Sequence, residues 1–187
     1  MNRYIILALF LQSCAVIQPS EAPKILKTLI LGADKIDVSK SFYDEMEYSF
    51  ANVRIGRLAS AILVLSSVDN DLYTWLGPNK ERIITQDGKV LYTSGLQHNI
   101  NYLEFTSIDN YEYKSSYMLE LLDPSAIIEV ELEYLISKSK VIENFYSPVL
   151  DWRGENLYFI NESGKTYKSI QYYHPMAPKI TIDFYFK

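Results

Sequence analysis

Few residues in this chain of 187 amino acids have the chemistry of a nucleophile, a general base or a metal ligand. The sequence has one cysteine, Cys14, and two histidines, His98 and His174. Neither histidine has a second histidine, a cysteine or an acid at the spacing of a metal-binding motif. The sequence also has no nucleophile elbow, Walker loop or dinucleotide-binding glycine pattern. We therefore predict that the protein is not an enzyme and that it holds no metal and no dissociable cofactor.

The residues before Cys14 predict a signal peptide. Arg3 supplies a positive charge, and the apolar run 4–11 follows it. This run is too short to cross a hydrocarbon core of ~30 Å as a helix, so removal is favoured over a permanent transmembrane span. The residues that follow, Leu11-Gln12-Ser13-Cys14, resemble the lipobox of bacterial lipoproteins, in which cleavage occurs before the cysteine. The alternative is that Cys14 is a free, buried cysteine in an apolar segment.

Cys14 is the predicted lipidation site. Its Sγ would carry a thioether-linked diacylglycerol, and its amino group would carry an N-acyl chain such as palmitate. Three acyl chains make anchoring effectively stable. Ala15, rather than an aspartate, follows the cysteine. By analogy with enteric lipoprotein sorting, this predicts the outer membrane, with the protein facing the periplasm, and leaves the inner membrane as the alternative.

Aromatic residues form a second group of candidate site residues, because the chain has 16 Tyr, 8 Phe and 2 Trp. Aromatic rings at alternate positions of a strand form a flat surface that suits the apolar face of a sugar ring, and tyrosine hydroxyls can fix its orientation. The alternative is that these rings fill the core and the cross-strand pairs of a tyrosine-rich β protein. The candidates for a glycan or partner surface are Tyr73, Trp75, Tyr111, Tyr113, Tyr172 and Tyr173.

The elements that would position these residues are mostly strands. From Tyr48 onward the apolar period changes from about 3.6 residues to about 2, and turn residues separate short runs of β-branched and aromatic residues. Asp87-Gly88 is typical of a type I′ hairpin, and Ser163-Gly164 indicates a second hairpin. The alternation over residues 128–134 places a row of glutamates on a solvated outer face. We predict strands at residues 49–55, 59–66, 72–76, 82–86, 90–93, 102–105, 127–136, 141–149, 156–160, 166–172 and 179–186.

This pattern predicts a mainly β fold: an antiparallel sandwich or a partly closed barrel with one or two short N-terminal helices. The helices are expected over residues 24–33 and from Ser39, whose hydroxyl would cap the second one. The domain prediction is a signal peptide at 1–13, the lipidated cysteine and a tether at 14–23, and one β-rich periplasmic domain at 24–187. With 18 Lys and Arg against 23 Asp and Glu, the charge of −5 argues against nucleic acid as a partner.

Two blocks of sequence carry a family resemblance. They comprise Trp75 with residues 82–96, and Trp152 with residues 156–159, residues 164–171 and Pro175. Together these blocks resemble the YjbF family of bacterial outer-membrane lipoproteins, which includes the group 4 capsule lipoprotein GfcB. Phe159 and Tyr167 stand where tryptophan is usual in that family.

The resemblance implies a non-enzymatic outer-membrane lipoprotein that assists the assembly or export of capsule or exopolysaccharide. It further implies docking onto envelope export machinery, either an outer-membrane β-barrel or a periplasmic export protein. An alternative is a polysaccharide-binding lipoprotein that grips the polymer through its Tyr and Trp surface. A third reading, an envelope hydrolase, would need acids that converge in one cleft.

Overall fold

The computed structural model describes residues 38–106 and 114–187, of which 104–106 and 114 are described by their backbone. The described residues all belong to one compact unit, Lys35–Lys187. The predicted boundaries at residues 13 and 23 and the predicted helix at 24–33 lie outside the described residues.

The described residues form one short helix and twelve strands. The elements are α2 (Lys40–Glu45), β1 (Phe50–Ile55), β2 (Ala61–Asp69), β3 (Leu72–Leu76), β4 (Arg82–Gln86), β5 (Lys89–Ser94), β6 (Ile100–Thr106), β7 (Lys114–Leu122), β8 (Ser125–Ile136), β9 (Lys140–Ser147), β10 (Trp152–Ile160), β11 (Thr166–Gln171) and β12 (Ile180–Tyr185).

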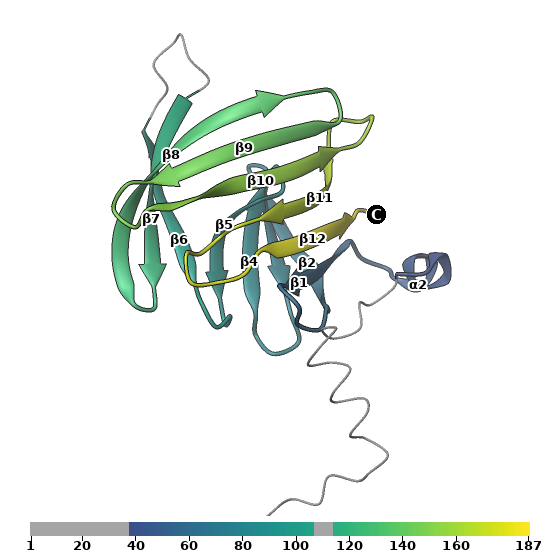
Figure 1. Ribbon diagram of the computed structural model, residues 1–187. Coiled ribbons are helices and arrows are strands. Elements are labelled where there is room, and N and C mark those ends of the chain that lie inside the picture. The colour runs from purple at the N-terminus through teal and green to yellow at the C-terminus, as the bar shows by residue number, and fades with distance from the viewer. Residues whose placement is uncertain (1–37, 107–113) are drawn as a thin grey trace, which may run out of the picture. The chain divides into compact units, whose positions relative to one another are not determined.

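The strands form a closed antiparallel barrel in which each strand pairs with the next along the chain, and β1 closes the barrel by pairing with β12 (Figure 1). The mainly β prediction and its barrel alternative are therefore confirmed. Eleven of the twelve strands overlap a predicted strand, and β7 is the one that the sequence pattern missed. Its second half, Met118–Leu122, consists of residues that favour helices, but pairing with both β6 and β8 overrides that preference.

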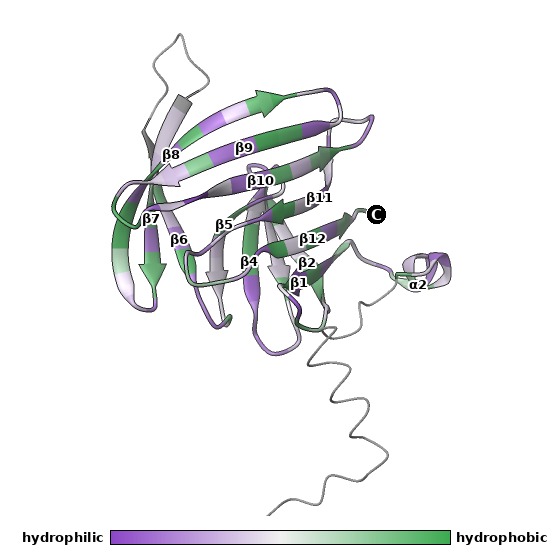
Figure 2. Ribbon diagram, in the orientation of Figure 1, coloured by the Kyte–Doolittle hydropathy of each residue, from purple (hydrophilic) through white to green (hydrophobic). Residues whose placement is uncertain are grey.

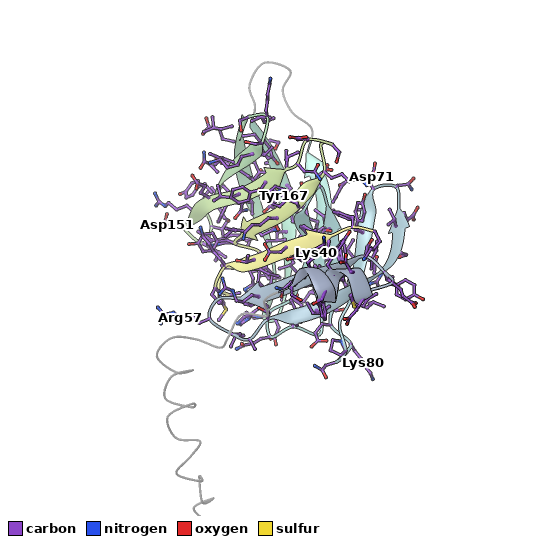
Figure 3. All side chains as sticks on the ribbon, turned by 90° about the vertical axis from the view of Figure 1, so that its right-hand side faces the viewer. Lys40, Arg57, Asp71, Lys80, Asp151 and Tyr167 are labelled. Atoms are coloured by element: carbon purple, nitrogen blue, oxygen red, sulfur yellow. The ribbon has the colours of Figure 1, made fainter. Side chains whose placement is uncertain are left out.

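Because the strands run up and down, the turns alternate between the two ends of the barrel. We call the end that carries the β2–β3, β4–β5, β8–β9 and β10–β11 turns the mouth, and the opposite end the far end. Asp71 in the β2–β3 turn and Lys80 in the β3–β4 turn mark these two ends in Figure 3.

Hydrophobic and hydrophilic residues alternate along many of the strands (Figure 2). Burial shows that this alternation separates the barrel interior from its outer surface. In β8, Ile128, Val130 and Leu132 are buried, whereas the intervening glutamates are exposed. The predicted solvated row of carboxylates is therefore confirmed. Apolar side chains from most of the strands form the core, with Trp75 its largest fully buried member.

The helix α2 begins where the sequence predicted a capped turn. Ser39 Oγ accepts a hydrogen bond from the backbone N–H of Phe42 at 3.1 Å. The Phe42 ring lies 5.6 Å from the Phe50 ring, which stacks on Tyr185 at 4.7 Å. These ring contacts join α2 to β1 and β12. Figure 1 shows α2 on the side of the barrel where the chain ends. No helix in the described part of the chain has the length and apolar character needed to span a membrane.

Candidate functional site

The β4–β5 turn crosses the barrel and bonds to β11. Asp87 and Gly88 have φ of 49° and 82°, the two positive angles that the type I′ prediction requires. Thr166 Oγ1 donates to the carbonyl oxygen of Asp87 at 2.8 Å. Gln171 Nε2 donates to the carbonyl oxygen of Gly88 at 2.8 Å, and Gln171 Oε1 accepts from the backbone N–H of Val90 at 3.0 Å. We call these contacts between the turn and β11 the clasp.

Two features of Gly88 favour glycine at this position: its positive φ and the close approach of Thr166. A matched pair of variants separates the two effects. A Cβ at Gly88 would lie 2.5 Å from Thr166 Cγ2, whereas a Cβ at Gly164, with nearly the same φ of 81°, would meet nothing within 4 Å. We expect Gly164→Ala to lower the free energy of unfolding by about 1 kcal/mol through backbone strain alone, and Gly88→Ala by about 3 kcal/mol. Urea unfolding measures both. Equal losses would show that the close approach of the turn to β11 has no energetic weight.

A buried polar cluster lies beside the clasp and includes Lys89, which directly follows Gly88. Lys89 Nζ lies 2.5 Å from Glu143 Oε2, and the Glu143 side chain is only 1% exposed. The other carboxylate oxygen accepts from Asn156 Nδ2 at 2.8 Å and from the Tyr158 hydroxyl at 3.3 Å. The ammonium of Lys89 also lies 5.1 Å from the centroid of the Tyr102 ring and 4.7 Å from that of Tyr117. These contacts compensate the burial of both charges.

Burial shifts the ionisation of this cluster. It lowers the pKa of Lys89, an effect that Glu143 partly reverses through its charge and its hydrogen bond. Burial also raises the pKa of Tyr102, Tyr117 and Tyr158 above the usual value, and the negative charge of Glu143 adds to that rise. The cluster therefore holds an ion pair among tyrosines that stay protonated.

The raised tyrosine pKa values predict a loss of stability at high pH. Above about pH 10 the tyrosines of the unfolded chain ionise while Tyr102, Tyr117 and Tyr158 keep their protons in the fold, so the free energy of unfolding falls as pH rises. The lowered pKa of Lys89 has the opposite effect and raises the free energy of unfolding as pH rises, but Lys89 is one group and the tyrosines are three. Urea unfolding at about pH 9 and about pH 11 measures the change. A Tyr158→Phe variant should show a smaller fall, and a free energy that stays constant over this range would contradict the assignment.

The larger of two cavities at the mouth has a volume of about 440 Å³ and opens above the polar cluster. Its apolar walls come from Leu91, Ile136, Val141 and Ile160. Its polar lining comes from Lys89, Tyr134, Glu143 and Tyr158. A cavity of this size with apolar walls and a few converging polar groups has the usual character of a small-ligand site.

The second cavity, of about 250 Å³, lies at the same mouth and is lined by aromatic rings and charged groups. The Tyr73 ring lies 5.6 Å from the Phe186 ring, and the ammonium of Lys165 lies 5.3 Å from the centroid of Phe186. Asp71 and Asp87 add carboxylates to the lining. Asp87, Gly164 and Thr166 line both cavities, so the clasp and the β10–β11 turn separate one cavity from the other.

The structure brings only some of the predicted aromatic site residues together. Trp75 is 1% exposed, stacks on Tyr73 at 6.2 Å and donates from Nε1 to Thr85 Oγ1 at 2.9 Å. Tyr172 and Tyr173 follow β11 toward the far end, where Tyr173 is 4% exposed. Of the described candidates, Tyr73 is the one that lines a mouth cavity. A polymer contact at any of them stays a prediction.

The remaining predicted site residues are Cys14, Tyr111 and Tyr113, and they lie outside the described residues.

Sequence reasoning missed the polar residues of the interior. Glu143, Asn156 and Gln171 are buried. Glu143 and Asn156 occupy inward positions in strands whose neighbouring inward residues are mostly apolar, and Gln171 lies next to the buried Ser169 in β11. A polar residue at such a position is the signal that could have identified them. The clasp also joins the two sequence blocks of the family resemblance, because Gly88 belongs to the first block and Gln171 to the second.

The two histidines meet at the far end. The His98 and His174 rings stack at 4.8 Å, and His174 Nδ1 accepts from the backbone N–H of Met176 at 3.0 Å. Burial lowers the pKa of His174 to about 4, and the neighbouring His98 adds to the effect. Within residues 38–106 and 114–187, no group of three His, Cys, Asp or Glu side chains is placed to hold a metal ion.

Comparisons with known proteins support the family resemblance. A search of curated proteins finds no match. The crystal structure of the hypothetical lipoprotein YmcC from Escherichia coli K12 shares the fold, with a TM-score of 0.63 and 15% sequence identity over 88% of this chain and 94% of that one. The family model described as group 4 capsule polysaccharide lipoprotein gfcB, YjbF, matches residues 24–118, more than half of the 187 residues. The chain therefore belongs to the YjbF family of capsule polysaccharide lipoproteins.

Proposed function

We propose that this protein is a lipid-anchored, non-enzymatic factor that assists the assembly or export of capsule or exopolysaccharide at the periplasmic face of the outer membrane. The observation that carries the proposal is membership of the YjbF family, whose description names a capsule polysaccharide lipoprotein. The proposal that the protein is not an enzyme is supported by the state of Glu143, the fully buried carboxylate of the polar cluster. Glu143 already binds Lys89, Asn156 and Tyr158, so it has little freedom to act as an acid or base.

The anchor is assigned to Cys14, the only cysteine in the sequence. Radiolabelled palmitate should be incorporated into the wild-type protein and not into Cys14→Ser, and the wild-type protein should fractionate with the outer membrane. Mass spectrometry of an intact, unacylated N-terminus would overturn the anchor.

The partner is assigned to the export machinery, either an outer-membrane β-barrel or a periplasmic export protein. A lipid anchor would confine the protein to the membrane surface and raise its effective concentration beside such a partner. Photo-crosslinkers at exposed positions on the mouth and the outer wall, Ile136, Tyr146 and Tyr167, cover two faces of the barrel. Crosslinking in intact envelopes should capture an export protein, and capture of abundant envelope proteins alone would contradict this assignment.

A second candidate function is direct binding of the polysaccharide, and the two cavities at the mouth favour it. Calorimetric titration of the protein with the surface polysaccharide of its host should then give saturable binding. An assembly factor that only docks onto other proteins gives no heat in this titration.

A further inference from the structure

The mouth contains two neighbouring cavities that share one wall. Asp87, Gly164 and Thr166 line both of them, and the hydrogen bond from Thr166 Oγ1 to the carbonyl oxygen of Asp87 ties the wall together. Asp87 and Gly164 are exposed, so solvent reaches the top of this wall. A ligand that enters the mouth therefore meets two adjacent sites rather than one large basin.

The smaller cavity suits a sugar ring. Tyr73 and Phe186 offer aromatic surface for the apolar face of the ring, and the carboxylates of Asp71 and Asp87 can accept hydrogen bonds from sugar hydroxyls. Lys165 adds a donor above Phe186. Thr85 also lines this cavity and accepts a hydrogen bond from Trp75 Nε1, so the buried tryptophan reports on what binds there.

The larger cavity combines hydroxyl groups with aliphatic walls. Tyr134 brings a phenolic hydroxyl to its lining, Tyr158 lies below with its own hydroxyl bonded to Glu143, and Ile136, which is 66% exposed, extends an apolar wall to the rim. Because the Lys89 and Glu143 charges are paired with each other, an incoming group finds mostly neutral hydrogen-bonding partners in this cavity. This lining also suits an uncharged part of a saccharide.

We propose that the mouth binds a polysaccharide chain that lies across the clasp, with neighbouring sugar units in the two cavities. Two adjacent sites of this chemistry match a ligand made of repeated units better than a single small molecule. The inference rests on the proposed role in polysaccharide assembly and deepens it, because it names the surface, the form of the ligand and the residues that contact it.

The test is the dependence of affinity on chain length. The probes are oligosaccharides from partial hydrolysis of the host's surface polysaccharide, separated by length from monosaccharide upward, with maltooligosaccharides of matching length as an unrelated glycan. Calorimetry on the full-length protein should show affinity rising about tenfold or more once the chain fills both cavities. Trp75 emission should change on binding, and a Trp152→Phe background removes the only other tryptophan.

Two conservative variants, each with a matched control, locate the site. Asp71→Asn removes a carboxylate from the smaller cavity, and Asp151→Asn makes the same change at the far end of the barrel (Figure 3). Both residues have a positive φ, 64° at Asp71 and 46° at Asp151, so the two substitutions have the same backbone setting. Tyr134→Phe removes a hydroxyl from the larger cavity, and Tyr146→Phe does so on the outer wall. Asp71→Asn and Tyr134→Phe should each weaken long-chain binding about tenfold, and the controls should leave it unchanged.

Lys165→Ala, on the exposed rim, replaces Asp71→Asn if that variant fails to fold. Affinity that does not depend on length, tight binding of maltooligosaccharides, or cavity variants that match their controls would overturn the inference. Absence of any binding, together with loss of surface polysaccharide in the Cys14→Ser strain, would overturn the inference and leave the export role standing. Absence of both effects would contradict the inference and the proposed function together.

Discussion

Glu143→Gln is expected to lower the free energy of unfolding by about 3 kcal/mol, because it leaves Lys89 charged in the barrel interior without its counter-charge. The Lys89 side chain is only 13% exposed and the Glu143 side chain 1%, so water from the mouth cavity only partly replaces the lost partner. The substitution also weakens the hydrogen bonds that Asn156 and Tyr158 donate to the carboxylate. Urea unfolding of the purified protein measures the loss.

A double variant separates the cost of an unpaired charge from the net value of the ion pair. Lys89→Met combined with Glu143→Gln removes both charges, so it should destabilise the protein less than Glu143→Gln alone. Asp151→Asn is the matched control, because it breaks an exposed ion pair with Arg153. The control should change the free energy of unfolding by no more than about 0.5 kcal/mol. Losses that simply add in the double variant would contradict the coupling of Lys89 and Glu143.

Gln171→Leu is expected to lower the free energy of unfolding by about 3 kcal/mol and to loosen the clasp. Gln171 is 2% exposed, and its side chain bonds to Gly88, Val90 and Ser169. Leucine has a similar volume but leaves the carbonyl of Gly88 and the N–H of Val90 buried without these partners, and each costs about 1–3 kcal/mol.

Hydrogen exchange at Val90 reports on the clasp directly. Its backbone N–H donates to Gln171 Oε1 in the native fold, so Gln171→Leu should speed its exchange relative to that of other core amides. Gln97→Leu is the control, because Gln97 is an exposed glutamine and should leave both exchange and stability unchanged. An unchanged Val90 amide in Gln171→Leu would show that Gln171 does not hold the turn.

The parts of the fold that depend on near neighbours could be predicted from the sequence. The two positive φ angles at Asp87 and Gly88 follow from the residue types at those two positions. The exposed glutamates of β8 follow from strict alternation within one strand. The Ser39 cap depends on residues three positions apart. In each case the interaction lies within a few residues along the chain.

The parts that depend on distant pairing could not be predicted. Gln171 bonds to Val90 across 81 positions, and Lys89 bonds to Glu143 across 54. No local pattern specifies that the β4–β5 turn crosses the barrel to reach β11. The strand β7 was missed for the same reason, because its residues favour a helix until the partners β6 and β8 are in place.

The aromatic candidates for the site also show that contacts between distant residues could not be predicted from the sequence. Trp75 and Tyr73 alternate along β3, which the sequence predicted, but both rings face the interior or the mouth rather than the outer surface. The alternation of side chains shows which residues share a face of a strand, but it does not show which face packs against the rest of the protein. Phe184 and Phe186 line the smaller cavity from the C-terminal end of the chain, and only the closure of β12 onto β1 and β11 brings them there.

The most direct test of the proposed role is the amount of surface polysaccharide on host cells that lack this protein. We expect deletion to reduce surface polysaccharide sharply, a plasmid copy of the wild-type chain to restore it, and a Cys14→Ser copy, expressed at the same level, to fail. An undiminished polysaccharide layer in the deletion strain would contradict the account.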